Sequence, residues 1–211
     1  MPKVKFEDLL VTGAHYGHVT RKWHPNYKPF ILMEKNGVHI INLEETLRYL
    51  DKALNYIQTK TKNKAEFLFV GTKKQARDIV QQEADRCSMF YVVERWLGGT
   101  LTNWKTISNS INRLNELENT LGDEKIANNL SKKELLDLSR EKDKLLSNIG
   151  GIRNLSGKPD LLVIFDTVKD KLAVLEAKKL GIPIIAIADT NSDPEPIDFI
   201  IPGNDLSLIH I

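Results

Sequence analysis

Short runs of almost purely apolar residues, separated by stretches with helical periodicity, are the feature that most constrains the fold of this chain. The runs cover residues 67–70, 91–93, 161–165 and 184–188, and a last short one covers 199–201. Helices are predicted at residues 74–87 and 171–180, the second ending at Gly181 with Pro183 beyond it. Because strands that are apolar on both faces need cover on both faces, the pattern predicts a parallel sheet with helices on each side.

The loops that follow these strands are predicted to share one edge of the sheet, where α/β folds usually bind their ligands. They lie around Gly71, Glu94, Asp166 and Asp189. Asp166 and Asp189 could act as an acid and a base. Carboxylates directly after strands more often cap the next turn, and we expect that role for both.

The sequence lacks the motifs with which such sheets usually bind nucleotides. The turn after the first central strand reads Gly71-Thr-Lys-Lys-Gln75, which is neither the dinucleotide fingerprint nor a P-loop. No serine stands in a nucleophile elbow, and the single cysteine, Cys87, has no plausible base. We therefore expect no catalytic residue, no cofactor and no small-molecule substrate. A nucleotide-dependent enzyme on the same kind of sheet is the alternative hypothesis.

Cysteine content and hydropathy limit the class of protein further. A single cysteine excludes an internal disulfide and a zinc cluster built on thiolates, and its place in a predicted helix suggests an inert, buried thiol. No apolar run approaches the length of a membrane span. We expect a soluble protein of a reducing compartment, with no membrane partner.

The N-terminal part combines regular elements with an irregular segment. Helices are predicted at residues 6–11 and 43–61, and two strands, 30–33 and 38–41, flank Asn36-Gly37, a strong hairpin signal. Residues 13–30 contain two glycines, two prolines, four aromatic residues and three histidines. A segment this aromatic without a regular pattern must be pinned to the body of the protein or to a partner.

Two kinds of ligand were considered for this segment. A metal site on His15, His18 and His24 lacks a carboxylate or thiolate at ligand spacing nearby, so we expect no metal there. The cations Arg21, Lys22 and Lys28 alternate with aromatic residues and are better suited to phosphate and base contact.

Residues 103–150 are predicted to form an insertion between the two halves of the sheet. One amphipathic helix spans residues 103–121 and stops at Gly122, and a capping box at Ser131 and Glu134 starts a second helix. Two such helices form an antiparallel hairpin that buries the stripe of each against the other. Residues 105–150 contain eight Lys and Arg and eight Asp and Glu, the even mixture of a solvated surface.

The stretch Glu94 to Trp104 contains two tryptophans, an arginine and the pair Gly98-Gly99 within eleven positions. The glycines predict an ordered loop. Trp96 and Trp104 are either buried anchors or part of an aromatic and basic surface for RNA, and composition alone does not choose between these.

The distribution of charge favours the N-terminal part of the chain as the binding site of an anionic partner. Residues 1–104 have 16 basic against 11 acidic residues, whereas residues 151–211 have 6 against 9.

Three long motifs in the chain resemble the family of small-subunit ribosomal protein number two, of the bacterial and organellar type. They lie at residues 9–18, at 69–76 continuing to 94–105, and at 159–166 followed by Glu176, 181–183 and 189–194. The resemblance covers residues 6–205. It implies a flavodoxin-like three-layer α/β/α sandwich with a protruding antiparallel coiled-coil hairpin, and a structural, non-catalytic role in translation.

The resemblance also implies partners and contact residues. The partners would be small-subunit rRNA and neighbouring small-subunit ribosomal proteins, including the large mRNA-binding protein numbered first in the subunit. The location would be the ribosome, in the cytoplasm or an organelle. The expected RNA-facing residues are Arg21, Lys22, Trp23, Lys28, Lys73, Lys74, Arg95, Trp96, Asn103, Trp104, Lys105 and Arg113.

The expected organisation is therefore one discontinuous α/β domain, residues 1–102 and 151–205, with an N-terminal arm and the hairpin of residues 103–150 inserted. After residue 205 the chain departs from the family pattern. Residues 206–211 resemble the translation of a sequencing adapter, so we expect a non-native tail on a C-terminally truncated family member.

Overall fold

A five-stranded parallel sheet lies at the centre of the computed structural model, which describes residues 4–123, 130–205 and 207. Its strands are β4 (Phe67–Val70), β5 (Phe90–Val92), β6 (Leu161–Ile164), β7 (Ile184–Ala188) and β8 (Phe199–Pro202), in the order β5-β4-β6-β7-β8. Numbered from β4 along the chain, this order is 2-1-3-4-5, which is the flavodoxin-like arrangement. The predicted fold class is confirmed.

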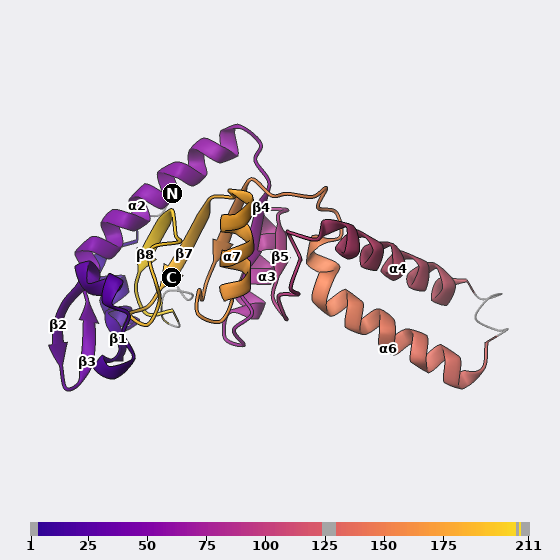
Figure 1. Cartoon of the computed structure of the whole chain (residues 1–211), viewed down its shortest axis with the longest axis horizontal. Coiled ribbons are helices and arrows are strands. Elements are labelled where there is room, and N and C mark those ends of the chain that lie inside the picture. The colour runs from indigo at the N-terminus through magenta and orange to yellow at the C-terminus, as the bar shows by residue number, and fades with distance from the viewer. Residues whose placement is uncertain (1–3, 124–129, 206, 208–211) are drawn as a thin grey trace.

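Helices cover the two faces of this sheet, as Figure 1 shows. On one face, Leu68 and Leu162 share a buried cluster with Ala173 and Ala177 of α7 (Lys171–Leu180). On the other face, Phe67 packs with residues of α2 (Leu43–Lys62), and α3 (Arg77–Arg86) covers the neighbouring part. Because successive side chains of a strand point to opposite faces, apolar strands supply both of these layers.

The N-terminal arm contains α1 (Phe6–Val11) and a second, antiparallel sheet in the order β1-β3-β2. The hairpin of β2 (Ile31–Lys35) and β3 (Val38–Ile41) was predicted. Asn36 and Gly37 both have positive φ, 54° and 75°, as its two-residue turn requires. The strand β1 (Tyr16–Val19) corrects the expectation of an irregular segment, because these residues pair with β3, a partner distant in sequence.

Two short 3-10 helices, η1 (Thr20–Lys22) and η2 (Pro25–Phe30), complete the arm. The Oη of the fully buried Tyr27 donates to the carbonyl of Ala188 at 2.6 Å, and the amide of His24 donates to the carbonyl of Thr190 at 2.7 Å. The arm is therefore pinned to the carboxyl end of β7.

The predicted helical hairpin protrudes from the β5 side of the sheet (Figure 1). It consists of α4 (Trp104–Gly122) and α6 (Lys132–Ile149), followed by η3 (Gly150–Ile152), and residues 124–129 between the helices are not among those described. The capping box is confirmed: Ser131 Oγ accepts from the amide of Glu134, and Glu134 Oε2 accepts from the amide of Ser131. Ile107 and Ile111 of α4 belong to the cluster that fills the sheet, so the root of the hairpin is part of the main core.

Two details differ from expectation. The helix predicted from residue 74 begins at Arg77, because residues 73–76 form a turn first. Cys87 follows the last residue of α3 and is exposed, since the chain turns away at Ser88, whose φ is 55°.

None of the described helices combines the length and the apolar character that crossing a bilayer requires. The expected tail, residues 206–211, lies outside the described residues except for Ser207.

Candidate nucleic-acid interface

The Gly98-Gly99 loop is organised around the carboxylate of Glu176, which lies on α7. Glu176 Oε1 accepts from Trp96 Nε1 at 3.1 Å and from the amide of Gly99 at 2.7 Å. Its Oε2 accepts from the amides of Leu101 and Thr102 at 2.9 and 3.0 Å, and from Thr102 Oγ1 at 3.0 Å. Burial raises the pKa of Glu176, but these hydrogen bonds outweigh it and lower that pKa below its ordinary value. The carboxylate therefore fixes the shape of the loop.

This arrangement decides which side chains of the loop face outward. Trp96 is only 6% exposed and belongs to the core, so the structure favours the buried-anchor alternative for it. Trp104 is half-buried and packs against the same core. Arg95, Asn103 and Lys105 are exposed. The loop therefore presents cations and an amide, with its first tryptophan turned inward.

Beside the loop, Lys73 is held by carboxylates. Its Nζ lies 2.7 Å from Asp205 Oδ2 and 3.4 Å from Asp166 Oδ2. Burial lowers the pKa of Lys73, but these two contacts outweigh it and raise that pKa above its ordinary value. Lys73 thus serves an internal ion network and does not face outward as expected, whereas Lys74 is exposed.

The same network occupies the crevice in which this fold usually binds nucleotides. The strand order reverses between β4 and β6, and ligands normally bind outside the carboxyl ends of such strands. There, Thr72 Oγ1 donates to Asp170 Oδ1 at 2.8 Å, and Asp166 Oδ1 accepts from the amides of Val168 and Lys169, the capping role that was predicted. Burial raises the pKa of Asp170 and of Asp205. Three carboxylates therefore share the crevice with Lys73 and with Lys169, whose Nζ donates to the carbonyl of Thr72 at 2.8 Å.

The N-terminal arm carries the second group of predicted contacts. Arg21, Lys22 and Lys28 are exposed on the two 3-10 helices. Trp23 is half-buried and stacks on His39, with ring centroids 5.1 Å apart and an interplanar angle of 25°. The arm therefore offers three free cations beside an indole ring that is already stacked within the protein.

Arg113, the predicted contact on the hairpin, is used to join its two helices. Arg113 Nε and Nη2 donate to the two carboxylate oxygens of Glu141 at 2.9 and 3.0 Å, and Glu116 lies 3.7 Å away. Such a bidentate pair orients the guanidinium along the helix pair. The remaining predicted residues are exposed and make no ion pair within the described part of the chain: Arg21, Lys22, Lys28, Lys74, Arg95, Asn103 and Lys105.

These seven residues form two surfaces. We call Lys74, Arg95, Asn103 and Lys105 the loop surface, and Arg21, Lys22 and Lys28 the arm surface. The loop surface lies beside β5 and the root of the hairpin, whereas the arm surface lies on η1 and η2, which are held at the carboxyl end of β7. Figure 1 shows these regions at opposite sides of the sheet. The structure does not bring the predicted contacts together into one site.

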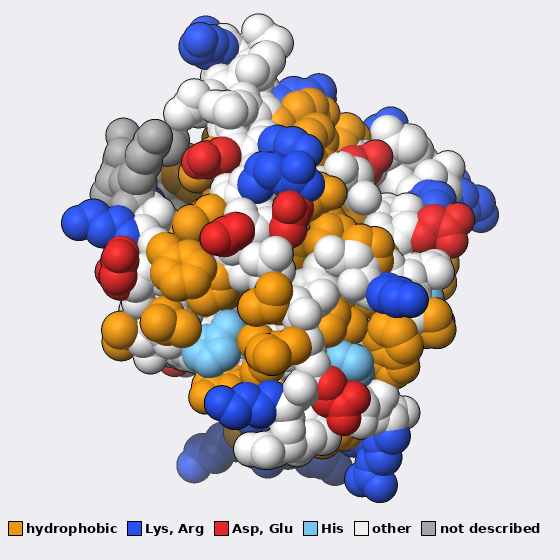
Figure 2. Space-filling model, turned by 90° about the vertical axis from the view of Figure 1, so that its left-hand side faces the viewer, with side chains coloured by type: hydrophobic (Ala, Val, Ile, Leu, Met, Phe, Trp, Pro, Cys, Tyr) orange, Lys and Arg blue, Asp and Glu red, His pale blue; other side chains and the backbone are white. Residues whose placement is uncertain are grey.

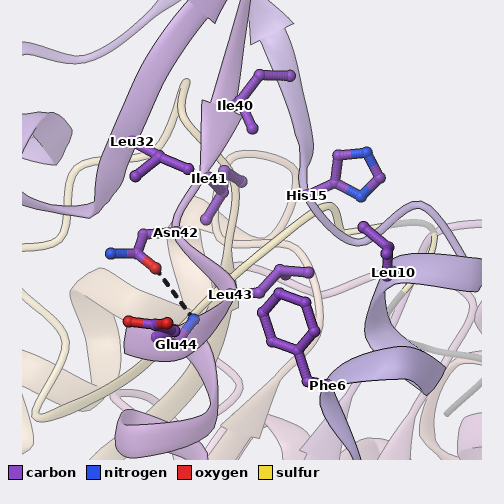
Figure 3. Close-up of a pocket in the computed structure, with 9 residues that line it drawn as sticks. All are labelled: Phe6, Leu10, His15, Leu32, Ile40, Ile41, Asn42, Leu43 and Glu44. Carbon is purple, nitrogen blue, oxygen red and sulfur yellow. Dashed lines mark hydrogen bonds between the residues drawn. The ribbon is translucent and has the colours of Figure 1, made fainter.

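A third surface was not recognised in the sequence. Figure 2 shows hydrophobic side chains gathered over the N-terminal arm, with histidine side chains among them. Phe6 and Leu10 of α1 face Leu32 and Ile40 of the small sheet across a hollow of about 230 Å³, with His15 at its side (Figure 3). We call these five residues the apolar face. Phe6, Leu10 and Leu32 are 41%, 48% and 62% exposed.

Two histidines of this region differ in their surroundings. Burial lowers the pKa of His15, which keeps its ring uncharged at neutral pH. His18 Nδ1 lies 3.0 Å from Asp189 Oδ2, a contact that raises the pKa of His18. Among the residues that the structure describes, no group of three His, Cys, Asp or Glu side chains is arranged to hold a metal ion.

A family model, described as ribosomal protein S2, matches residues 9–211 of the chain. This chain belongs to the ribosomal protein S2 family. It is 52% identical over 205 residues to the small ribosomal subunit protein uS2 of Rickettsia bellii (strain OSU 85-389), covering 97% of this chain and 70% of that protein. The uS2 protein of Paracoccus denitrificans is 49% identical over 205 residues, covering 97% of this chain and 78% of that protein.

The match to the S2 family decides between the two hypotheses drawn from the sequence. It confirms the resemblance carried by the three motifs, and it sets aside the nucleotide-dependent enzyme. Within this S2 chain, the long Gly-Gly motif is explained in part by folding, because Trp96, Gly99 and Thr102 all bind Glu176. The apolar face could not be predicted from the sequence, because its apolar residues come from α1 and from the β2–β3 hairpin. Each of these elements looks like an ordinary amphipathic element when it is read separately.

Proposed function

We propose that this protein is a structural, non-catalytic component of the small ribosomal subunit that binds rRNA through its loop surface and its arm surface. The observation that carries the proposal is the outward presentation of Arg95 and Lys105 by a loop whose interior is fixed on Glu176. A rigid loop with free cations can bind phosphates without first ordering its own backbone. Membership of a ribosomal protein family supports rRNA as the polyanion.

The arm surface supports the same role from the other side of the sheet. Arg21, Lys22 and Lys28 are exposed, and the arm that carries them is anchored by Tyr27 and by the amide of His24. Two separated cationic surfaces on one rigid body can contact two segments of folded RNA at once. Binding of this kind depends on shape and on many phosphate contacts, so it should weaken steeply with salt.

The test of the RNA proposal is binding of the full chain to deproteinised small-subunit rRNA over a series of KCl concentrations. A variant with Arg95→Gln and Lys105→Gln should bind more weakly, and the slope of log K against log[KCl] should become shallower by about 2 units. The matched control, Arg86→Gln with Lys52→Gln, removes one arginine and one lysine from other exposed positions. Equal slopes for the two variants would contradict the assignment of the loop surface.

We further propose that the apolar face binds neighbouring small-subunit proteins, among them the large mRNA-binding protein numbered first in the subunit. Phe6, Leu10 and Leu32 are exposed around one hollow, and His15 adds no charge at neutral pH. Clustered exposed apolar side chains of this kind suit a protein partner better than a phosphate backbone.

This second proposal is tested with the purified mRNA-binding protein. Leu32→Lys should weaken its binding at least about tenfold, because a charge would replace an apolar contact. Leu175→Lys is the control, since Leu175 of α7 is exposed to a similar degree, 53%, and does not line the hollow of the apolar face. A Kd unchanged by Leu32→Lys, or weakened equally by both substitutions, would exclude the apolar face as the docking surface.

A further inference from the structure

The amino-terminal edge of the parallel sheet carries an unexplained group of lysines. This amino-terminal edge, the upper edge of the sheet in Figure 1, is where α2 ends before β4, where residues 153–160 enter β6 and where α7 ends before β7. We call its lysines the amino-edge patch. They are Lys60, Lys62, Lys64, Lys158, Lys178 and Lys179.

Adjoining hollows bring the core of this patch together. Lys60 and Lys158 line one hollow of about 360 Å³, together with Gly181 and Pro183. Lys178 lines a second hollow of about 210 Å³ that shares Gly181 and Pro183 with the first. Lysines from α2, from the strand entry and from α7 therefore border one continuous depression, although they are far apart in sequence.

The positive charge of the patch is not neutralised by ion pairs within the described part of the chain. Lys158 Nζ donates to the carbonyl of Leu180 at 2.7 Å, and Lys60 Nζ lies 5.4 Å from the ring centroid of Tyr56. Neither of these contacts involves an acid. Five of the six lysines are exposed, and Lys60 is half-buried.

The acids of this edge are turned towards the backbone. Asp160 Oδ2 accepts from the amide of Glu66 at 2.9 Å, and Asp198 Oδ2 accepts from the amide of Ile184 at 2.8 Å. With Glu66, and with Glu195, which lines the second hollow beside Lys178, these are four acids against six lysines. At the carboxyl edge, Asp166, Asp170 and Asp205 line the crevice. The cations Lys73 and Lys169 lie in the same crevice, so its charges largely offset one another, whereas lysines outnumber acids at the amino edge.

The chemistry of the patch favours RNA over an acidic protein. Cores of protein interfaces are depleted in lysine and enriched in aromatic residues and methionine. None of the strongly exposed large apolar side chains in the described part of the chain belongs to this patch. Lysine acts as a mobile point charge, which suits contact with successive phosphates of a backbone.

We propose that the amino-edge patch is a further RNA-binding surface, which contacts the phosphate backbone of rRNA at the amino-terminal edge of the sheet. The proposal rests on the proposed function, since it takes rRNA as the polyanion. It assigns to RNA contact six lysines that lie in none of the motifs pointing to the family. It also reverses the usual rule for this fold, in which ligands bind at the carboxyl ends of the strands.

The test uses the full chain, deproteinised small-subunit rRNA and a KCl series. The triple variant Lys60→Gln, Lys158→Gln, Lys178→Gln should bind about tenfold more weakly at low salt, with a slope of log K against log[KCl] shallower by about 3 units. The control triple variant Lys35→Gln, Lys52→Gln, Lys171→Gln removes the same charge from other exposed positions and should change the slope by less than about 1 unit. The triple Lys→Arg variant at positions 60, 158 and 178 keeps the charge and should retain the wild-type slope.

The outcomes separate the alternatives. Equal slopes for the two glutamine variants would overturn the proposal, because net charge alone would then account for the loss. An unchanged rRNA slope, combined with failure to enter small subunits assembled with their proteins, would assign the patch to an acidic protein and also overturn it. Failure of the wild type to bind rRNA at low salt would refute the proposed function itself.

A glutamine variant could also bind weakly because it does not fold. Thermal unfolding, followed by circular dichroism, shows whether each glutamine variant is folded. The arginine variant then becomes the deciding measurement, because it keeps both the charge and the length of the side chains. A slope shallower than that of the wild type would contradict the proposal, and the wild-type slope would support it.

Discussion

Glu176 illustrates how one residue can shape a surface without belonging to it. Its carboxylate is nearly buried, yet it accepts five hydrogen bonds from Trp96, Gly99, Leu101 and Thr102. An unpaired charge in such a place would be costly, whereas a fully bonded one holds the backbone of the loop in place. The outward positions of Arg95 and Lys105 follow from this inward anchor.

Replacing this anchor should therefore destabilise the protein in a pH-dependent way. Glu176→Gln should lower the free energy of unfolding at pH 7 by about 2–3 kcal/mol, because the charge-assisted hydrogen bonds are lost. The lowered pKa of Glu176 means that its contribution is complete above the ordinary pKa of 4.5 and is lost as the pH falls through the folded value. Denaturant unfolding at pH 7 and at a series of values below 4.5 should show the difference between wild type and variant narrowing. A difference that is the same at every pH would contradict this account.

Gly151 and Gly98, two glycines in different surroundings, offer a matched test of backbone packing. A Cβ on Gly151 would overlap the carbonyl oxygen of Tyr91, whereas a Cβ on Gly98 would meet nothing within 4 Å. Gly151→Ala should therefore cost about 1–3 kcal/mol by forcing the root of the hairpin away from β5. Gly98→Ala should stay within about 0.5 kcal/mol of wild type. Thermal and denaturant unfolding measure both, and equal effects would show that the close approach at Gly151 is not required.

At the scale of elements, the sequence predicted the helices, strands and turns that a local pattern determines. It did not predict the structure that depends on contacts with residues distant in sequence. The apolar runs, the Asn36-Gly37 turn and the Ser131 capping box each contain their own signal, and the structure confirms them. The strand β1 has no such signal, because Gly17 and His18 become a strand only when β3 lies beside them. The direction in which Trp96 points was also undecidable, since it depends on Glu176, which lies 80 residues further along the chain.

That the helical hairpin is an insertion into the α/β domain remains a prediction. Substitution in its root and truncation of its distal half should change the free energy of unfolding by different amounts. Ile111 lies in the main core and Arg113 pairs with Glu141, so the root is integrated with the sheet. Replacing residues 119–135 with a short Gly-Ser linker should change the free energy of unfolding by less than about 1 kcal/mol, whereas Ile111→Ala should cost about 2–4 kcal/mol. Denaturant unfolding compares the two. A truncation as damaging as Ile111→Ala would show that the distal half is required for the fold.

At the scale of the whole molecule, the surfaces divide by chemistry. The loop surface and the arm surface carry exposed cations at opposite sides of the sheet, the amino-edge patch adds lysines along the amino-terminal edge, and the apolar face lies on the arm. Sequence reasoning found the cations of the motifs, but it did not separate Lys73 and Arg113, which are used internally, from those that face outward. That distinction depends on partners such as Asp205 and Glu141, which only the fold brings near.

Co-sedimentation with small ribosomal subunits tests the central claim most directly. Small subunits depleted of their own S2 protein are mixed with the full chain at low and at high KCl, and the pellets are assayed for the protein. We predict that the chain sediments with the subunits at low salt and is released as salt rises, because phosphate contacts carry the binding. A chain that stays in the supernatant at every salt concentration, while binding a mononucleotide tightly, would contradict the account.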